Sequence, residues 1–166
     1  MKYFSYGSNM FHERLSKRVP SCEFYRIGTL KKHVLKFHKR SQDDSGKCNA
    51  YFTGQEEDEI LGVIYDIDPN EKHLLDQAEG LGNGYHESKI QLRTDQGTLV
   101  AFMYEADANA IDDKLVPYSW YKNYVIEGAR QNNLPKNYII GIEQIVSKSD
   151  PDKKREDKNH RILFGK

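Results

Sequence analysis

The sequence lacks the long apolar runs and the cysteine content that would mark a membrane protein or a disulfide-rich secreted one. No stretch of its 166 residues approaches the roughly 20 apolar residues of a membrane-spanning helix. The N-terminal residues pass directly into a predicted strand, so we expect no signal peptide. Cys22 and Cys48 are the only cysteines, which suits a reducing compartment better than a disulfide scaffold. These absences predict a cytoplasmic protein with no membrane partner.

The sequence also lacks an excess of positive or negative charge, and it lacks the common cofactor-binding motifs. Lys and Arg number 25, as do Asp and Glu, and the formal net charge is +0, so nothing favours a nucleic-acid partner. The six histidines show no metal-ligand spacing, and the cysteines form no CxxC pair. Phosphate-binding and dinucleotide-binding loops are not found. Ser8 lacks a G-x-S-x-G context, which argues against a serine nucleophile.

The order of the remaining patterns predicts the fold class. Strand-like segments cover residues 3–6, 22–30, 32–39, 50–52, 60–65, 85–93 and 98–105, and helical patterns cover 10–18, 68–79, 119–132 and the residues after 135. Strands come first and most of the helix comes late, which favours an α+β fold with a mixed or antiparallel sheet that can close into a barrel. Segment 60–65 is apolar on both faces and should be a central strand. We also expect residues 99–104 to be well buried.

The chain is long enough for one domain with one core, and it contains no internal repeat or linker. We assign residues 1–146 to this domain. Residues 147–166 are mostly charged and are expected to form a C-terminal tail, part of it disordered. The apolar residues 162–164 could dock this tail on the domain.

The stretch Tyr3-Phe4-Ser5-Tyr6-Gly7-Ser8-Asn9-Met10 organises the rest of the interpretation. It predicts a strand, a tight turn and a helix start. Glycine permits unusual backbone angles and close approach of a ligand, and Ser8 or Asn9 can cap the helix. Unused N–H groups at such a turn suit a carboxylate, a phosphate or a developing oxyanion. The alternative is an ordinary strand-to-helix turn that binds nothing.

Glu79 is the candidate catalytic carboxylate. It ends an amphipathic helix that Asp68, Pro69 and Glu71 are expected to start, and it precedes a loop with three glycines. The helix dipole disfavours a negative charge at this end, a placement that suits general acid/base work. The alternative is an exposed glutamate before a glycine helix stop.

These residues together resemble the gamma-glutamylcyclotransferase-like superfamily. The likeness rests on the YGSN turn, on Glu13-Arg14, on residues 76–80 with Tyr85, and on segments 117–121, 128–129 and 134–135. It implies a small mixed barrel flanked by helices and a cofactor-free acyltransferase of glutathione metabolism that forms 5-oxoproline. The implied catalytic residue is Glu79, and the implied substrate-binding residues are Tyr6, Gly7, Ser8, Asn9, Tyr85 and Tyr121. Residues 45–49 depart from the glycine-rich stretch that many members have before the next strand.

The implied reaction is intramolecular. The α-amine of a γ-glutamyl amide attacks the γ-carbonyl, closes a lactam and expels the amine, with Glu79 as proton shuttle. The YGSN turn would hold either the oxyanion or the α-carboxylate of the substrate. The sequence leaves open whether the substrate is a γ-glutamyl-amino acid or a γ-glutamyl-amine. It also leaves open a non-catalytic module that binds a small amino-acid-like anion, an interaction protein, and the oligomeric state, for which a homodimer is one option.

Overall fold

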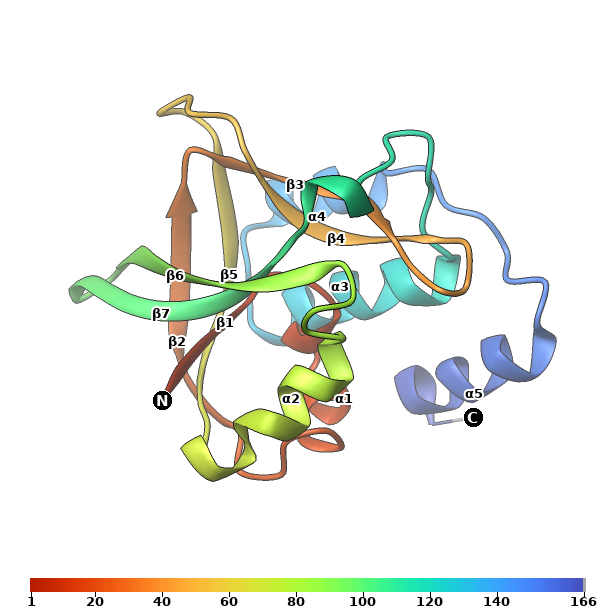
Figure 1. Cartoon of the computed structure of the whole chain (residues 1–166), viewed down its shortest axis with the longest axis horizontal. Helices are drawn as coiled ribbons and strands as arrows, with labels where there is room; N and C mark the ends of the chain where they lie inside the picture. The colour runs from red at the N-terminus through yellow and green to blue at the C-terminus, as the bar shows by residue number, and fades with distance from the viewer. Residues whose placement is uncertain (166) are drawn as a thin grey trace.

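In the computed structural model, which describes residues 1–165, five strands close into a small barrel (Figure 1). Around the barrel the strands are β1 (Lys2–Ser5), β5 (Glu59–Asp66), β2 (Glu23–Lys31), β6 (Tyr85–Thr94) and β7 (Gly97–Ala106). Neighbours run antiparallel except β1 and β7, which meet in parallel where Tyr3 pairs with Phe102. The predicted α+β fold with a mixed barrel is confirmed.

Strand β5 lies in the interior of the sheet, as its apolar pattern predicted. It pairs with β1 on one side and with β2 on the other. Ile60, Val63, Ile64 and Tyr65 are all buried, because the barrel interior covers one face and helices cover part of the other. This strand anchors the N-terminal strand β1, from which the YGSN turn emerges.

The hairpin of β6 and β7 corrects one expectation. Residues 101–104 are buried, but Leu99 is only partly buried and Val100 is 61% exposed. The hairpin tip extends beyond the barrel in Figure 1, where Leu99 still packs at the margin of the core but Val100 does not. Burial along β7 therefore begins only where β1 and β4 lie beside it.

Two further strands, β3 (His33–Arg40) and β4 (Gly46–Phe52), form a separate antiparallel hairpin above the barrel in Figure 1. The helices are α1 (His12–Ser16), α2 (Lys72–Glu79), α3 (Ser119–Gln131), α4 (Lys136–Glu143) and α5 (Lys153–Phe164), with short 3₁₀ turns η1 (Ser8–Met10), η2 (Pro69–Glu71) and η3 (Ala108–Ala110). The helical segment predicted from residue 68 begins as expected, but as the 3₁₀ turn η2 that leads into α2: Pro69 follows Asp68, whose side chain accepts from the Asn70 N–H.

Helix α3 supports the YGSN turn from behind. Its predicted stripe is buried, including Tyr121, Tyr124 and Val125. Gly128 lies so close to η1 that an added Cβ would be 2.6 Å from the Phe11 backbone nitrogen. Only glycine allows this approach, so the turn and α3 are placed together by backbone contact.

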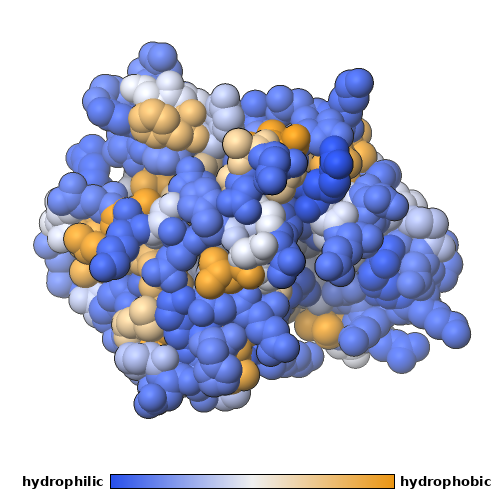
Figure 2. All heavy atoms as spheres, viewed as in Figure 1, coloured by the Kyte–Doolittle hydropathy of each residue, from blue (hydrophilic) through white to orange (hydrophobic). Residues whose placement is uncertain are grey.

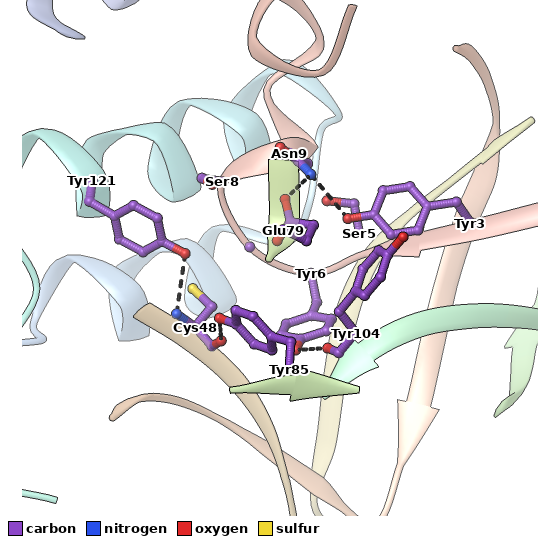
Figure 3. Close-up of a pocket in the computed structure, with 11 residues that line it drawn as sticks. Tyr3, Ser5, Tyr6, Ser8, Asn9, Cys48, Glu79, Tyr85, Tyr104 and Tyr121 are labelled. Atoms are coloured by element: carbon purple, nitrogen blue, oxygen red, sulfur yellow. Dashed lines mark hydrogen bonds between the residues drawn. The ribbon is translucent and has the colours of Figure 1, made fainter. Parts of the chain in front are cut away.

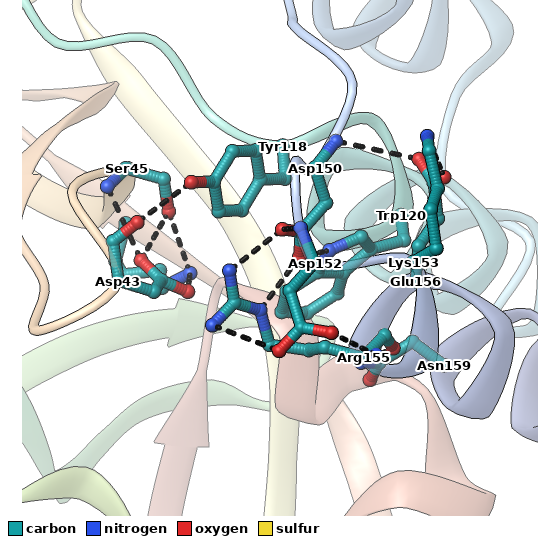
Figure 4. A network of polar contacts seen from close by, with 11 residues as sticks. Asp43, Ser45, Tyr118, Trp120, Asp150, Asp152, Lys153, Arg155, Glu156 and Asn159 are labelled. Carbon is teal, nitrogen blue, oxygen red and sulfur yellow. Dashed lines mark hydrogen bonds and ion pairs between the residues drawn. The ribbon is translucent and has the colours of Figure 1, made fainter.

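Residues 147–165 are structured, whereas part of the C-terminal tail was expected to be disordered. Helix α5 packs against α3, and Leu163 is buried as the docking hypothesis required. Figure 4 shows the junction, where the buried carboxylate of Asp150 accepts from Trp120 Nε1 at 2.8 Å and from two Arg155 nitrogens at 2.6 Å each. The many charges of this segment predicted a solvated tail. The sequence does not show that Asp150 and Arg155 form an ion pair with each other. The domain boundary at residue 147 stays a prediction.

Figure 2 shows one face of the molecule, on which hydrophilic residues predominate and hydrophobic ones lie scattered between them. Isolated apolar groups of this kind are normal on a protein surface. Among residues 1–165, the structure has no helix that is both long and apolar enough to span a membrane.

Candidate active site

A small cleft, with a cavity volume of about 30 Å³, lies where the end of β1, the hairpin strand β4, the end of α2, the start of β6 and helix α3 converge. All seven residues predicted for the site line this cleft: Tyr6, Gly7, Ser8, Asn9, Glu79, Tyr85 and Tyr121. Four further lining residues are Tyr3, Ser5, Cys48 and Tyr104 (Figure 3). Tyr3 and Tyr121, which are 118 residues apart in the sequence, therefore line the same cleft.

Crowding by strand β4 requires glycine at position 7. Its φ of −119° lies outside the left-handed region that favours glycine. An added Cβ, however, would lie 3.0 Å from Cys48 Cβ and 3.3 Å from its sulfur. The glycine thus lets strand β4 approach the turn and close one side of the cleft.

The turn presents backbone donors, although not by the expected capping. Neither Ser8 nor Asn9 caps a helix with its side chain, and the predicted helix over 10–18 is reduced to η1 and the five-residue α1. Within residues 1–165, the backbone N–H groups of Gly7, Ser8 and Asn9 donate no hydrogen bond to the protein. These donors are free for an anionic or polar group in the cleft.

Glu79 is held at the cleft by one carboxylate oxygen. Helix α2 ends there because Gly80 adopts the left-handed conformation, with φ of 71°. Glu79 Oε1 accepts from Asn9 Nδ2 at 2.8 Å and from an Arg18 guanidinium nitrogen at 2.7 Å. In the described part of the chain, Oε2 has no hydrogen-bond partner. One oxygen therefore fixes the side chain and the other is available for proton exchange.

Arg18 was missed from the sequence. Its guanidinium lies between Glu79 and the side-chain oxygen Oδ1 of Asn9, to which it donates at 2.9 Å. Both side chains of the ion pair are mostly covered, with 24% of Arg18 and 19% of Glu79 exposed. The only signal available was its place after Asn9 at the end of a predicted helix, and that does not indicate which carboxylate it meets.

The predicted tyrosines form walls, but their hydroxyl groups differ in role. Tyr6 donates to the Tyr104 carbonyl and Tyr85 to the Cys48 carbonyl at 2.6 Å, so neither O–H is free for substrate. Tyr121 instead accepts from the Cys48 N–H at 3.2 Å, which leaves its own O–H proton to point elsewhere. Of these three tyrosines, Tyr121 is therefore the one with an unused donor.

Burial keeps the aromatic hydroxyls and the thiol of the cleft neutral. It raises the pKa of Tyr6, Tyr85 and Tyr121 well above the ordinary tyrosine value. Burial also raises the pKa of Cys48 to about 12. A thiol with this pKa is not a nucleophile at neutral pH. Glu79 is thus the one carboxylate among otherwise neutral lining groups.

Ser5 supplies a second unused group. Its hydroxyl oxygen is buried, lines the cleft and has no hydrogen-bond partner among residues 1–165. A buried polar atom normally has a partner, so a bound ligand or a water molecule is expected beside it. Ser5 lies two residues after Tyr3 and shares its face of β1, a placement that strand periodicity alone indicates. No group of three or more His, Cys, Asp or Glu side chains suitable for a metal ion occurs in residues 1–165.

Comparisons with known proteins decide the family. A family model described as the AIG2-like family matches residues 59–142, about half of the chain. The gamma-glutamylcyclotransferase of Homo sapiens is 30% identical over 148 residues, covering 86% of this chain and 77% of that protein. This chain belongs to the AIG2-like family. The predicted resemblance of this AIG2-like protein to the gamma-glutamylcyclotransferase-like superfamily is confirmed.

Further similarities agree with this assignment. The gamma-glutamylcyclotransferase of Bos taurus is also 30% identical to the AIG2-like chain over 148 residues, covering 86% of it and 77% of that protein. A solved structure named gamma-glutamyl cyclotransferase superposes with a TM-score of 0.85 at 24% identity, covering 97% of this chain and 98% of that one. The shared fold therefore includes most of the segment after residue 147.

Proposed function

We propose that this protein is a gamma-glutamylcyclotransferase that converts a γ-glutamyl amide into 5-oxoproline and a free amine or amino acid. The relatives of that name support the reaction class. The observation that carries the proposal is the state of Glu79. Asn9 and Arg18 hold one of its oxygens, and the other is unbonded in a cleft with unused backbone donors.

The chemistry needs no second reactant. The α-amine nitrogen of the γ-glutamyl group attacks the γ-carbonyl carbon, and a C–N bond forms that closes the five-membered lactam. The amide C–N bond then breaks, and its electron pair stays on the leaving nitrogen. Because both reacting groups belong to one molecule, the protein has only to hold a folded conformer, and such orientation is worth several kcal/mol (up to roughly 10) in related intramolecular reactions.

Glu79 moves the protons in this scheme. At neutral pH the substrate amine is mostly ammonium, so a base must remove a proton before attack. Glu79 Oε2 takes that proton and returns one to the departing nitrogen, which is general base followed by general acid catalysis. The Arg18 and Asn9 contacts keep the carboxylate in place during both transfers.

The YGSN turn stabilises the negative groups of the substrate. The free N–H groups of Gly7, Ser8 and Asn9 are donors for the oxyanion of the tetrahedral intermediate or for the α-carboxylate. Tyr121, with its unused O–H, adds a side-chain donor, and Tyr6 and Tyr85 shape the cleft. We further propose a cytoplasmic enzyme of glutathione metabolism that uses no metal or cofactor. A homodimer stays a prediction.

The experiment is 5-oxoproline release from γ-glutamyl-alanine by the purified full chain in the presence of a metal chelator. The variant Glu79→Gln keeps an oxygen for Asn9 and Arg18 but removes the base. We expect its kcat to fall about 10²-fold or more, the scale of general acid/base catalysis. Glu57→Gln is the matched control, because Glu57 is exposed and does not line the cleft.

Near-normal turnover by a folded Glu79→Gln variant would remove Glu79 from the mechanism. No release from γ-glutamyl-alanine, γ-glutamyl-ε-lysine or glutathione by the wild type would refute the cyclotransferase assignment for these substrates.

A further inference from the structure

A buried lysine with no carboxylate partner lies behind one wall of the cleft. Lys39, on β3, is 7% exposed. Lysine is almost never so deeply buried unless its charge is paired. Within residues 1–165, no carboxylate oxygen lies within 4.0 Å of Lys39 Nζ, and its hydrogen bond is a long one of 3.5 Å to the Asn83 carbonyl.

The lysine opposite Lys39 on the hairpin has its charge paired with a carboxylate. Lys47 pairs with Lys39 in the register of β3 and β4. Its ammonium group bonds Asp43 Oδ2 and Ser45 Oγ, both at 2.8 Å. An unpaired buried charge destabilises a fold, whereas a paired and hydrogen-bonded one is compensated. Within residues 1–165, Lys39 by contrast has no carboxylate in direct contact with its ammonium group.

The position of this charge relates it to the cleft. Lys39 Nζ lies 4.4 Å from the ring centroid of Tyr85, a wall of the cleft. Gly84 makes room for it, because an added Cβ there would be 3.0 Å from Lys39 Cε and 3.4 Å from Nζ. Burial lowers the pKa of Lys39, and among the opposing carboxylates Glu79 has the largest effect. The ammonium group is therefore within the electrostatic reach of the catalytic carboxylate.

The proposed reaction indicates which group of the substrate could bind the ammonium group of Lys39. In a γ-glutamyl-amino acid, the α-amine and α-carboxylate share one carbon, so both lie on the side of Glu79 and the YGSN turn. In the folded conformer the α-amine meets the γ-carbonyl, so the scissile amide also lies within reach of Glu79. A second carboxylate is carried by the leaving amino acid, beyond that amide. Tyr85 and Lys39 come from β6 and β3, which are separate from the elements that bear the turn and Glu79.

We propose that Lys39 is a specificity-determining residue that binds the carboxylate of the leaving amino acid beside Tyr85. It selects γ-glutamyl-amino acids over γ-glutamyl-amines, whose leaving group has no carboxylate. This inference rests on the proposed cyclotransferase function and narrows its substrate class.

The test compares γ-glutamyl-alanine with γ-glutamyl-ethylamine, which differs in lacking the leaving-group carboxylate. The full chain is assayed as wild type, Lys39→Gln, Lys39→Met and Lys36→Gln. Lys36 is the matched control, because it lies on the same strand with its ammonium group over an aromatic ring, that of Tyr51, outside the cleft. Thermal unfolding checks that each variant is folded, and the methionine variant keeps the apolar stem in case glutamine disturbs packing.

We expect the wild type to prefer γ-glutamyl-alanine. Both Lys39 variants should raise the KM for this substrate about 10- to 100-fold, the scale of one charged hydrogen bond, and change kcat/KM for γ-glutamyl-ethylamine less than about twofold. Lys36→Gln should leave both substrates unchanged. Removing an uncompensated charge should also leave the melting temperature of Lys39→Met equal to or above that of wild type.

An equal loss on both substrates, or no loss on either, would overturn the role of Lys39 while leaving the cyclotransferase reaction intact. Absence of 5-oxoproline from both substrates with the wild type would instead overturn the proposed function, and this inference with it. The two failures are distinguished by the wild-type arm alone.

Discussion

Asp150 should be the residue on which attachment of the C-terminal helix most depends. Its side chain is fully buried and accepts four hydrogen bonds: from Trp120, from the Asp152 N–H, and two from Arg155. The bidentate Arg155 contact and the Trp120 contact lower the pKa of Asp150 to about 2. In Asp150→Asn, one charge-assisted acceptor is lost and an N–H₂ group faces the guanidinium.

The expected loss follows from the same pKa. An unfolded aspartate has a pKa of about 3.9, so a folded pKa of about 2 corresponds to roughly 3 kcal/mol of stability, at about 1.4 kcal/mol for each pH unit. Breaking a fully buried pair costs about 3–5 kcal/mol, but Arg155 is one-third exposed and solvent weakens the pair. We expect Asp150→Asn to lower the free energy of unfolding by about 2–3 kcal/mol at pH 7.

The pH dependence has a definite sign. Because the folded pKa of Asp150 lies below the unfolded one, its contribution is complete above about pH 4. It is lost as the pH falls toward about 2, where the folded carboxyl also takes up a proton. The difference between wild type and Asp150→Asn should therefore be constant from pH 7 to 5 and shrink between about pH 4 and 2.

The assay is urea unfolding followed by circular dichroism and by the fluorescence of Trp120, the single tryptophan of the chain. Asp152→Asn is the matched control. Asp152 caps α5 by accepting from the Arg155 N–H, and asparagine caps helices equally well. The reasoning is refuted if Asp150→Asn unfolds within 0.5 kcal/mol of this control, or if its deficit is undiminished at about pH 2.

Two further substitutions test the support of the site. Gly128→Ala should destabilise the protein by about 3 kcal/mol in thermal or urea unfolding, because the new Cβ would lie 2.6 Å from the Phe11 nitrogen. The control is Gly141→Ala in α4, where an added Cβ meets nothing within 4 Å and should stabilise the protein by about 1 kcal/mol. Equal effects of the two substitutions would contradict this packing. Arg18→Met should lower kcat about tenfold with little change in KM, because Glu79 loses one of two anchors; unchanged kcat would show that Arg18 does not position it.

The fold class and several members of the site were predictable from local patterns. The apolar run of β5, the glycine after Glu79 and the buried stripe of α3 each express a local rule of periodicity or helix termination, and all three are confirmed. The placement of Glu79 at a helix end beside a glycine loop follows from the chain near it. These features depend on neighbours a few residues away, which a sequence displays directly.

The connections between distant segments were not predictable in this way. Arg18 and Glu79 are 61 residues apart, and nothing in either segment indicates their ion pair. Asp150 and Arg155 looked like charges of a solvated tail until Trp120, 30 residues earlier, was found to share their network. A pattern records the type of a residue, whereas its partner depends on how the barrel, hairpin and helices pack.

The sequence by itself determined that this chain forms an α+β barrel with a glycine turn and a carboxylate at a helix end. Only the tertiary structure, over residues 1–165, decided that Glu79 keeps one oxygen free, that Tyr121 alone among three predicted tyrosines has an unused O–H, and that Lys39 is buried without a carboxylate partner. The physical reason is that hydrogen bonds and ion pairs are satisfied between segments far apart in the chain. Reactivity resides in the groups that this pairing leaves unsatisfied.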